Sequence, residues 1–306
     1  MKKESSREEL INALRDVELN AANAIFVGPN FQIVPKFIRD TRNYFSAQTG
    51  NIDLSANGGP EKPINDYIAD KTKNIIQDAL SPGTIDTDTV MLLVNTIFFN
   101  GTWERTFDPH DTRNQYFYQL GGAVKQVETM NDERWMKLKK DDVNKVDVGE
   151  LSFSGGRFSL YIALPQELDG ITDLEEIIAR PGQVQQLFTG LEYDRVDLAI
   201  PKFKTETTLS LIPTLRDMGI TKAFDNGRAD FRGISSGQVY VSEVMHKAVI
   251  EVEESGTVAA AMTYSGLVPV SADPSPRESF IADHPFVYFL RDNQTGQILF
   301  QGKFSG

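Results

Sequence analysis

The stretch Glu251-Val-Glu-Glu-Ser-Gly-Thr-Val-Ala-Ala-Ala-Met-Thr-Tyr-Ser-Gly-Leu-Val-Pro-Val-Ser271 decides how the whole chain is interpreted. It begins acidic, passes through a glycine and a string of small residues, and ends in an apolar tetrapeptide before Ser271. Its alanines bury little surface and its glycines favour flexibility, so it is not typical of an ordinary core strand. With a period of two, however, four small residues fall on one face: Thr257, Ala259, Ala261 and Thr263. This pattern indicates a segment that is a loop in one state and fits between existing strands in another.

Composition is typical of a globular protein and excludes several classes of function. The 306 residues are 40% hydrophobic and 24% charged, which is enough for a large core. A net charge of −12 argues against nucleic acid and against anionic membranes as partners. The absence of cysteine excludes disulfide frameworks, thiolate metal sites and thiol nucleophiles. No run of about eighteen consecutive apolar residues occurs, so no segment is predicted to span a membrane.

Hydrophobic periodicity predicts a mixed α+β chain, with helices early and strands dominating the second half. Helices are expected at residues 6–16, 34–46, 64–80, 173–179 and 209–218. Strands are expected at residues 20–27, 89–99, 158–164, 196–200, 239–252, 286–290 and 298–304. The run at 89–99 is almost continuously apolar, so we expect that strand to be buried on both faces. By composition alone, the proline-containing residues 255–279 form a long surface loop.

Residues suited to catalysis are few in this chain. It has neither a Gly-x-Ser-x-Gly motif nor a His-Glu-x-x-His motif, and its only histidines are His110, His246 and His284. Adjacent acids such as Asp141 and Asp142 are more typical of a solvated surface than of a catalytic carboxylate pair. We therefore expect no enzymatic activity, no metal site and no cofactor.

A set of separated motifs occurs in an order known from one family. They are Asn95-Thr-Ile-Phe-Phe-Asn-Gly-Thr-Trp103, Leu164-Pro165, Ile200-Pro-Lys-Phe-Lys204, Val244-Met-His-Lys-Ala248, Glu253-Glu-Ser-Gly-Thr257, Asp283-His-Pro-Phe286 and Phe300-Gln-Gly-Lys303. Each motif is weak by itself, but this many in one order are specific. With them the chain resembles the serpins, the protease inhibitors whose reactive loop inserts into their own sheet.

The resemblance implies the serpin fold, which has a large central mixed β-sheet, further β-sheets, surrounding helices and a mobile reactive-centre loop. It implies a single domain over residues 1–306, with the loop at about residues 255–279. It also assigns seven residues to the hinge of the loop: Glu254, Gly256, Thr257, Ala259, Ala260, Ala261 and Thr263.

Three more residues match the family's sheet-opening positions. Asn95 and His246 match a polar cluster under the centre of the sheet, and Trp103 matches a tryptophan near the point where the loop enters. Without the resemblance, the favoured explanation is an ordinary one: His246 is a hydrogen-bonded core histidine and Trp103 only packs.

The family's spacing from Gly256 implies that Val270–Ser271 is the scissile bond. In the family's mechanism the chain is a suicide substrate: the protease attacks the carbonyl of Val270, an acyl-enzyme forms, and the freed loop inserts into the sheet. Val270 is small and β-branched, which suits the narrow apolar pocket of an elastase-like serine protease. Arg277 lies seven residues further on, and there we expect a trypsin-like enzyme to cut and to treat the chain as a substrate.

The resemblance further implies a secreted, extracellular monomer. Residues 1–7 lack the apolar region of a secretory signal. The sequons at Asn100 and Asn293 are candidate N-glycosylation sites.

The chain departs from the family at its N-terminus. Its first matching segment, at residues 19–27, corresponds to a strand that follows several helices in serpins. We therefore expect those helices to be missing and the sheet to expose apolar surface in their place. This keeps a non-inhibitory serpin, acting as a carrier, chaperone or storage protein, as the alternative function. The small hinge residues favour the inhibitor, because members that do not insert often carry bulky or charged residues there.

Overall fold

The computed structural model describes residues 17–257 and 277–306, which divide into two compact units. One unit comprises Leu19–Phe99 and Glu206–Ile250, and the other contains Asn100–Thr205 and Glu251–Gly306. Strands dominate the described chain, and helices are few and short, so the expected α+β class is confirmed. Within the described ranges, every helix is too short or too polar to cross a membrane.

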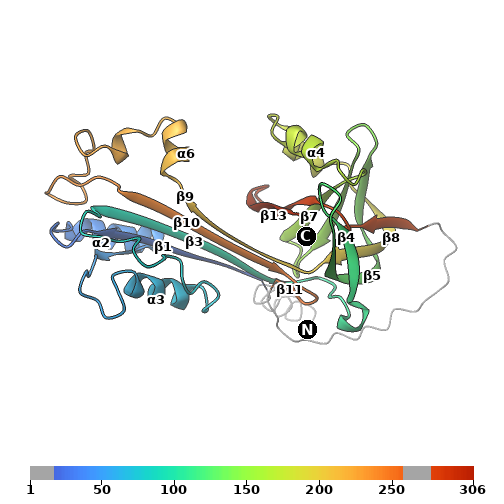
Figure 1. Cartoon of the computed structure of the whole chain (residues 1–306), viewed down its shortest axis with the longest axis horizontal. Helices are drawn as coiled ribbons and strands as arrows, with labels where there is room; N and C mark the ends of the chain where they lie inside the picture. The colour runs from blue at the N-terminus through green and yellow to red at the C-terminus, as the bar shows by residue number, and fades with distance from the viewer. Residues whose placement is uncertain (1–16, 258–276) are drawn as a thin grey trace, which may run out of the picture. The chain divides into compact units, whose positions relative to one another are not determined.

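A six-stranded mixed sheet has the strand order β2-β1-β3-β10-β9, with β11 pairing on β3 (Figure 1). Its members are β1 (Val17–Val27), β2 (Gln48–Asn51), β3 (Met91–Thr102), β9 (Phe203–Ser210), β10 (Glu243–Val252) and β11 (Gly256–Thr257). The pairs β1–β2 and β3–β10 are parallel, whereas β11 runs antiparallel to β3. This is the large mixed sheet that the resemblance implies.

The two faces of β3 are covered unequally. Its even-numbered side chains from 92 to 98 are buried, while the odd-numbered ones from 93 to 97 are only half-buried. Lys247 of β10 lies opposite Thr96, and its ammonium donates to the carbonyl oxygen of Asp78 at 2.9 Å. The segment that follows α3 therefore covers the even face, and the odd face, which carries Asn95, is more open. The expectation of burial on both faces is thus wrong for one of them.

Helix α3 (Lys62–Lys71) lies beside the strands of this sheet in Figure 1. It buries Ile64 and Ile68. Pro63 lies in its first turn, where the fixed φ of proline favours the helical backbone. The apolar spacing predicts a helix to residue 80, but the helix ends at residue 71. Lys73 and Asn74 adopt left-handed backbone angles, with φ of 53° and 63°, and such angles cannot continue an α-helix.

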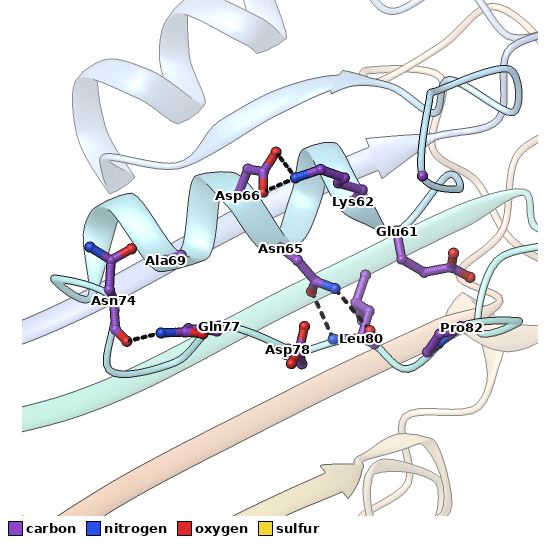
Figure 2. Close-up of a pocket in the computed structure, with 11 residues that line it drawn as sticks. Glu61, Lys62, Asn65, Asp66, Ala69, Asn74, Gln77, Asp78, Leu80 and Pro82 are labelled. Carbon is purple, nitrogen blue, oxygen red and sulfur yellow. Dashed lines mark hydrogen bonds and ion pairs between the residues drawn. The ribbon is translucent and has the colours of Figure 1, made fainter.

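The chain after α3 is held by side-chain hydrogen bonds in place of helical ones. Asn65 donates from Nδ2 to the carbonyl oxygen of Leu80 and accepts from the amide of Leu80, both at 2.9 Å (Figure 2). Thr72 is fully buried, and its hydroxyl donates to the carbonyl oxygen of Ile68 at 2.8 Å. These bonds keep Ile76 and Leu80 buried in a segment that is not helical.

An eight-stranded sheet has the order β12-β8-β5-β6-β7-β13-β14, with β4 pairing on β5. Its members are β4 (Arg113–Tyr118), β5 (Val124–Asp141), β6 (Val146–Ser152), β7 (Phe158–Pro165), β8 (Glu192–Pro201), β12 (Glu278–Ile281), β13 (Phe286–Asp292) and β14 (Ile298–Phe304). Every residue of β7 is buried. This central strand forms the core together with β13, which pairs antiparallel with it.

The remaining helices are short. They are α2 (Pro35–Phe45), α4 (Ile171–Ile178), α5 (Gln183–Leu187), α6 (Ile212–Asp217) and the 3-10 turns Pro109–Asp111 and Lys222–Phe224. Helices α4 and α5 bury Leu174 and Leu187 against Tyr161 and Phe289 of the eight-stranded sheet. A helix is expected at 209–218, but its first two residues belong to β9.

Candidate functional site

The hinge that the sequence predicts lies at the end of β10. The chain turns at Glu253–Gly256, where two backbone hydrogen bonds of 2.8 and 3.0 Å join Glu253 and Gly256. It then returns as β11, which pairs antiparallel with the end of β3, with Thr257 opposite Gly101. The first residues of the predicted loop thus already lie along a strand of the six-stranded sheet.

Trp103 stabilises this turn. Its backbone amide donates to the carbonyl oxygen of Ser255 at 3.0 Å, and its indole Nε1 donates to the carbonyl oxygen of Glu253 at 2.8 Å. The ring is 3% exposed and stacks on Phe153 with 4.3 Å between ring centroids. Because an unpaired indole N–H would be costly at this depth, the tryptophan and the turn stabilise each other.

The carboxylate of Glu254 has two partners from distant segments. The Thr112 hydroxyl donates to Oε1 at 2.7 Å, and the Lys202 ammonium lies 3.0 Å from Oε2. Partial burial acts to raise the pKa of Glu254, but these contacts outweigh it and leave the pKa below its ordinary value. Burial likewise acts to lower the pKa of Lys202, and Glu254 reverses the effect and raises it. The pair is therefore ionised at neutral pH and ties the hinge to the eight-stranded sheet.

Position 256 accepts only glycine. The φ of Gly256 is 135°, a backbone angle that residues with a side chain rarely adopt. A Cβ atom there would lie 2.0 Å from the carbonyl oxygen of Gly101 and 2.8 Å from Cα of Thr102. The tight approach of β11 to β3 depends on this glycine.

Asn95 and His246 are direct hydrogen-bond partners, and Asn23 of β1 joins them. His246 Nδ1 lies 2.7 Å from Oδ1 of Asn95, and Nδ2 of Asn95 donates to Oδ1 of Asn23 at 2.6 Å. Since Oδ1 of Asn95 can only accept, the imidazole carries its proton on Nδ1. Burial lowers the pKa of His246, so the ring is neutral at pH 7. Three strands are cross-linked through one chain of hydrogen bonds.

The structure separates the three sheet-opening residues into two places. Asn95 and His246 are direct partners in one compact unit, whereas Trp103 belongs to the hinge in the other. Sequence reasoning missed Asn23, Thr112 and Lys202. All three are ordinary polar residues in their own segments, and no local signal marks them.

Several predicted positions lie outside the described residues. They are Ala259, Ala260, Ala261, Thr263 and both sides of the expected scissile bond, Val270 and Ser271.

The two sequons occupy different settings. Asn100 is half-buried within β3. Asn293 follows β13, and its Nδ2 donates to Oγ of Ser159 at 2.8 Å while its Oδ1 accepts from the Tyr161 hydroxyl at 3.1 Å. Among residues 17–257 and 277–306, no group of three or more His, Asp or Glu side chains is placed to hold a metal ion.

Comparisons with known proteins agree with this architecture. The serpin (serine protease inhibitor) family model matches residues 2–306. Antichymotrypsin-2 of Bombyx mori is 33% identical over 98% of this chain and 80% of its own length. The solved structure of Serpin48 from the insect Tenebrio molitor has a TM-score of 0.83 at 32% identity, covering 99% of this chain and 80% of that one. Human thyroxine-binding globulin has a TM-score of 0.84 at 26% identity, covering 95% of this chain and 76% of that one.

The family match spans both compact units and includes the hinge and the sheet on which it pairs. Serpins are mostly protease inhibitors rather than enzymes. With a glycine-dependent turn feeding a strand onto a mixed sheet, and with a family match over nearly all of its length, this chain belongs to the serpin family of serine protease inhibitors.

Proposed function

We propose that this serpin inhibits an elastase-like serine protease as a suicide substrate, with cleavage at Val270–Ser271 followed by insertion of the loop between β3 and β10. The observation that carries the proposal is the register of β11 on β3. Gly256 pairs with Thr102 and Thr257 pairs with Gly101, both antiparallel.

Continuing that register would place the residues of the loop along β3 in a simple order. Residues 257, 259, 261 and 263 would lie opposite residues 101, 99, 97 and 95. Side chains opposite each other in an antiparallel pair share a face, so these small residues would share the face of β3 that is buried at Phe99 and Gly101 and half-buried at residues 95 and 97. At the buried end, where Thr257 and Ala259 would lie, a charged side chain would be costly.

Insertion must first separate β3 from β10. These strands now pair directly in parallel, with seven residue pairs from Glu243–Leu92 to Val249–Phe98. An inserted strand would form one ladder with each of them in place of the single ladder that is lost. The net gain is on the order of ten hydrogen bonds, or roughly 10 kcal/mol. A free-energy difference of that size favours the inserted loop over the uninserted one by several powers of ten in the equilibrium constant.

The hinge geometry supports this path. The turn at 253–256 is held by Trp103, and the Glu254 carboxylate is held by Lys202 and Thr112. The start of the loop is therefore fixed at the end of β3, where insertion must begin.

The target preference rests on Val270. A small β-branched side chain fills the narrow apolar pocket of an elastase-like protease. In the pocket of a trypsin-like protease, the same side chain would leave the buried acid unpaired. No lysine or arginine occurs between residues 258 and 276. Pro269 disfavours helical backbone at Val268, which favours an extended chain before the scissile bond.

The test is to mix the chain with an elastase-like serine protease and to look for a covalent complex that survives SDS. Thr257→Arg is the matched variant, because its loop sequence keeps Val270 while its first inserting side chain carries a charge. We expect the complex with the natural chain and clean cleavage with the variant. Clean cleavage after Val270 in both proteins would refute the inhibitory proposal.

A heat measurement separates the alternative function. Thyroxine-binding globulin shares this fold and is solved with thyroxine bound, which supports a non-inhibitory carrier as the second candidate. If the loop inserts, cleavage after Val270 raises the unfolding temperature sharply. An unchanged unfolding temperature after complete cleavage favours the carrier.

A further inference from the structure

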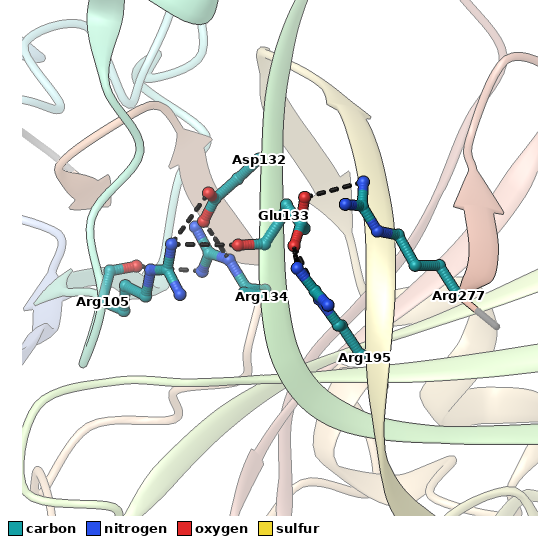
Figure 3. Close-up of polar contacts among 6 residues, drawn as sticks. All are labelled: Arg105, Asp132, Glu133, Arg134, Arg195 and Arg277. Atoms are coloured by element: carbon teal, nitrogen blue, oxygen red, sulfur yellow. Dashed lines mark hydrogen bonds and ion pairs between the residues drawn. The ribbon is translucent and has the colours of Figure 1, made fainter. Parts of the chain in front are cut away.

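Arg277 occupies a defined position between two acidic side chains. It directly precedes β12, and its guanidinium Nη1 lies 2.8 Å from Oε2 of Glu133 and 3.4 Å from Oδ1 of Asp197. Figure 3 shows that the two carboxylate oxygens of Glu133 face different arginines, one facing Arg277 and the other facing Arg195. Arg277 is also the one basic residue between Lys247 and Arg291.

The strand register explains why these acids need cations. Glu133 of β5 is directly opposite Asp197 of β8, so two carboxylates share one face of the sheet. Like charges in that position repel each other. Arg195 donates from Nε to Oε1 of Glu133 at 2.6 Å, and Arg277 contacts the second oxygen, Oε2. Arg195 therefore neutralises Glu133, and Arg277 contacts both members of the acidic pair.

The backbone that follows Arg277 is also held. Residues 278–281 form β12, which pairs in parallel with β8 over four positions. Phe280 is 1% exposed, and Glu278 forms an ion pair with Lys140 of β5. The residues on the carboxyl side of the Arg277–Glu278 bond are thus part of a sheet.

We propose that Glu133 and Asp197 shield the Arg277–Glu278 bond from trypsin-like proteases, in contrast to the cleavage at Arg277 that the sequence alone led us to expect. Such a protease must take the arginine side chain into a pocket with its own buried acid, and it binds an extended segment on both sides of the bond. Both requirements demand that Arg277 leave its two carboxylates and that β12 leave β8. Hydrolysis itself is ordinary: water supplies the new oxygen on the Arg277 carboxylate, and the Glu278 nitrogen takes a proton and becomes the amine. The shield does not depend on cleavage at Val270, so it stands or falls apart from the inhibitory proposal.

The test is limited trypsin digestion of the full chain, with the initial rate of release of residues 278–306 measured by mass spectrometry. The test variant is Glu133→Gln with Asp197→Asn, and the matched control is Glu192→Gln, an exposed carboxylate of β8 four residues before Val196. Each partly exposed ion pair shifts a local equilibrium by about 1.4- to 5-fold, so we expect cleavage of the double variant to be about 2- to 30-fold faster. Cleavage follows the open population when β12 recloses faster than the protease cuts.

Arg277→Lys provides an independent variant. It keeps a trypsin site, but the compact ammonium of lysine is more strongly hydrated than the guanidinium, so its contacts with Glu133 and Asp197 are expected to be weaker. For each chain, the rate of cleavage after residue 277 is divided by the rate for a free peptide of residues 273–282 with the same residue at 277. We expect this ratio to be higher for Arg277→Lys than for the natural chain.

Three outcomes contradict the shield. The natural chain could be cut after Arg277 as fast as the free peptide, the double variant could be cut no faster than Glu192→Gln, or Arg277→Lys could show no increase. Cleavage after the exposed Lys145 monitors general loosening of the fold. If it rises equally in the double variant, Arg277→Lys alone decides between support and refutation.

Discussion

Replacement of Gly256 by alanine tests the hinge at its tightest point. The new Cβ would lie 2.0 Å from the carbonyl oxygen of Gly101, whereas real Cβ contacts are essentially never below 3.0 Å, so β11 must move by about 1 Å or more. Such a shift breaks the pairing of Thr257 with Gly101 and the two hydrogen bonds between Glu253 and Gly256.

The magnitude follows from the bonds lost. Two to four hydrogen bonds at about 0.5–1.5 kcal/mol each give a range of about 1–6 kcal/mol. Because β11 can detach locally and let its groups meet water, we expect the free energy of unfolding to fall by about 1–3 kcal/mol. The unfolding temperature then falls by roughly 2–6 °C.

The assay is thermal unfolding of three variants side by side. Gly233→Ala and Gly190→Ala are the controls, since a Cβ at either position meets nothing within 4 Å. Gly190 also has a φ of 74°, so this control carries the backbone strain of a left-handed residue without the clash. A Gly256→Ala variant no less stable than Gly190→Ala would refute the close approach of β11 to β3.

Three further predictions concern the stability of the folded chain. Trp103→Phe keeps the aromatic packing but removes the hydrogen bond to the Glu253 carbonyl, so we expect a loss of about 1–3 kcal/mol. Asn65→Ala leaves the amide and carbonyl of Leu80 without their partners, with an expected loss of about 2–3 kcal/mol in urea unfolding. Burial lowers the pKa of His246 from 6.5, so the unfolded chain binds a proton on this ring more readily than the folded chain does. The stability that depends on the neutral ring is therefore lost as the pH falls through the folded pKa. The stability of the natural chain between about pH 7 and pH 5 should therefore fall more steeply than that of His246→Gln.

Long apolar runs made the core strands predictable. The strands expected at 89–99, 158–164 and 286–290 correspond to β3, β7 and β13, because nearly continuous apolar character is rare outside a buried sheet. Strand β5, at 18 residues, escaped prediction. Charged residues such as Glu133 and Lys137 hide the strand pattern in its sequence. The alternation of these residues with buried ones becomes visible only when the pairing with the neighbouring strands is known.

The end of α3 shows where periodicity misleads. Ile75, Ile76 and Leu80 continue the helical spacing, and Ile76 and Leu80 are indeed buried. Their burial comes instead from a non-helical segment that Asn65 holds by hydrogen bonds to Leu80. Hydrophobic spacing predicts which residues are buried, but it cannot distinguish two backbone paths that bury them equally.

The amino-acid sequence by itself determined the family, because the motifs that carry it are recognised in order along the chain, and it predicted a hinge that includes Glu254 and Gly256. The need for a glycine at 256 comes from the tertiary structure, because a Cβ atom there would meet the carbonyl oxygen of Gly101. Tertiary structure alone decided the partners of those residues. Lys202 contacts Glu254, Asn23 bonds to Asn95, and Asn95 bonds to His246, a contact that joins positions 151 residues apart. Polar side chains of this kind carry no local signal, since a surface residue and a buried partner look alike until the strands are paired. The charge and hydrogen bonding of the site are therefore properties of the sheet register and not of any one segment.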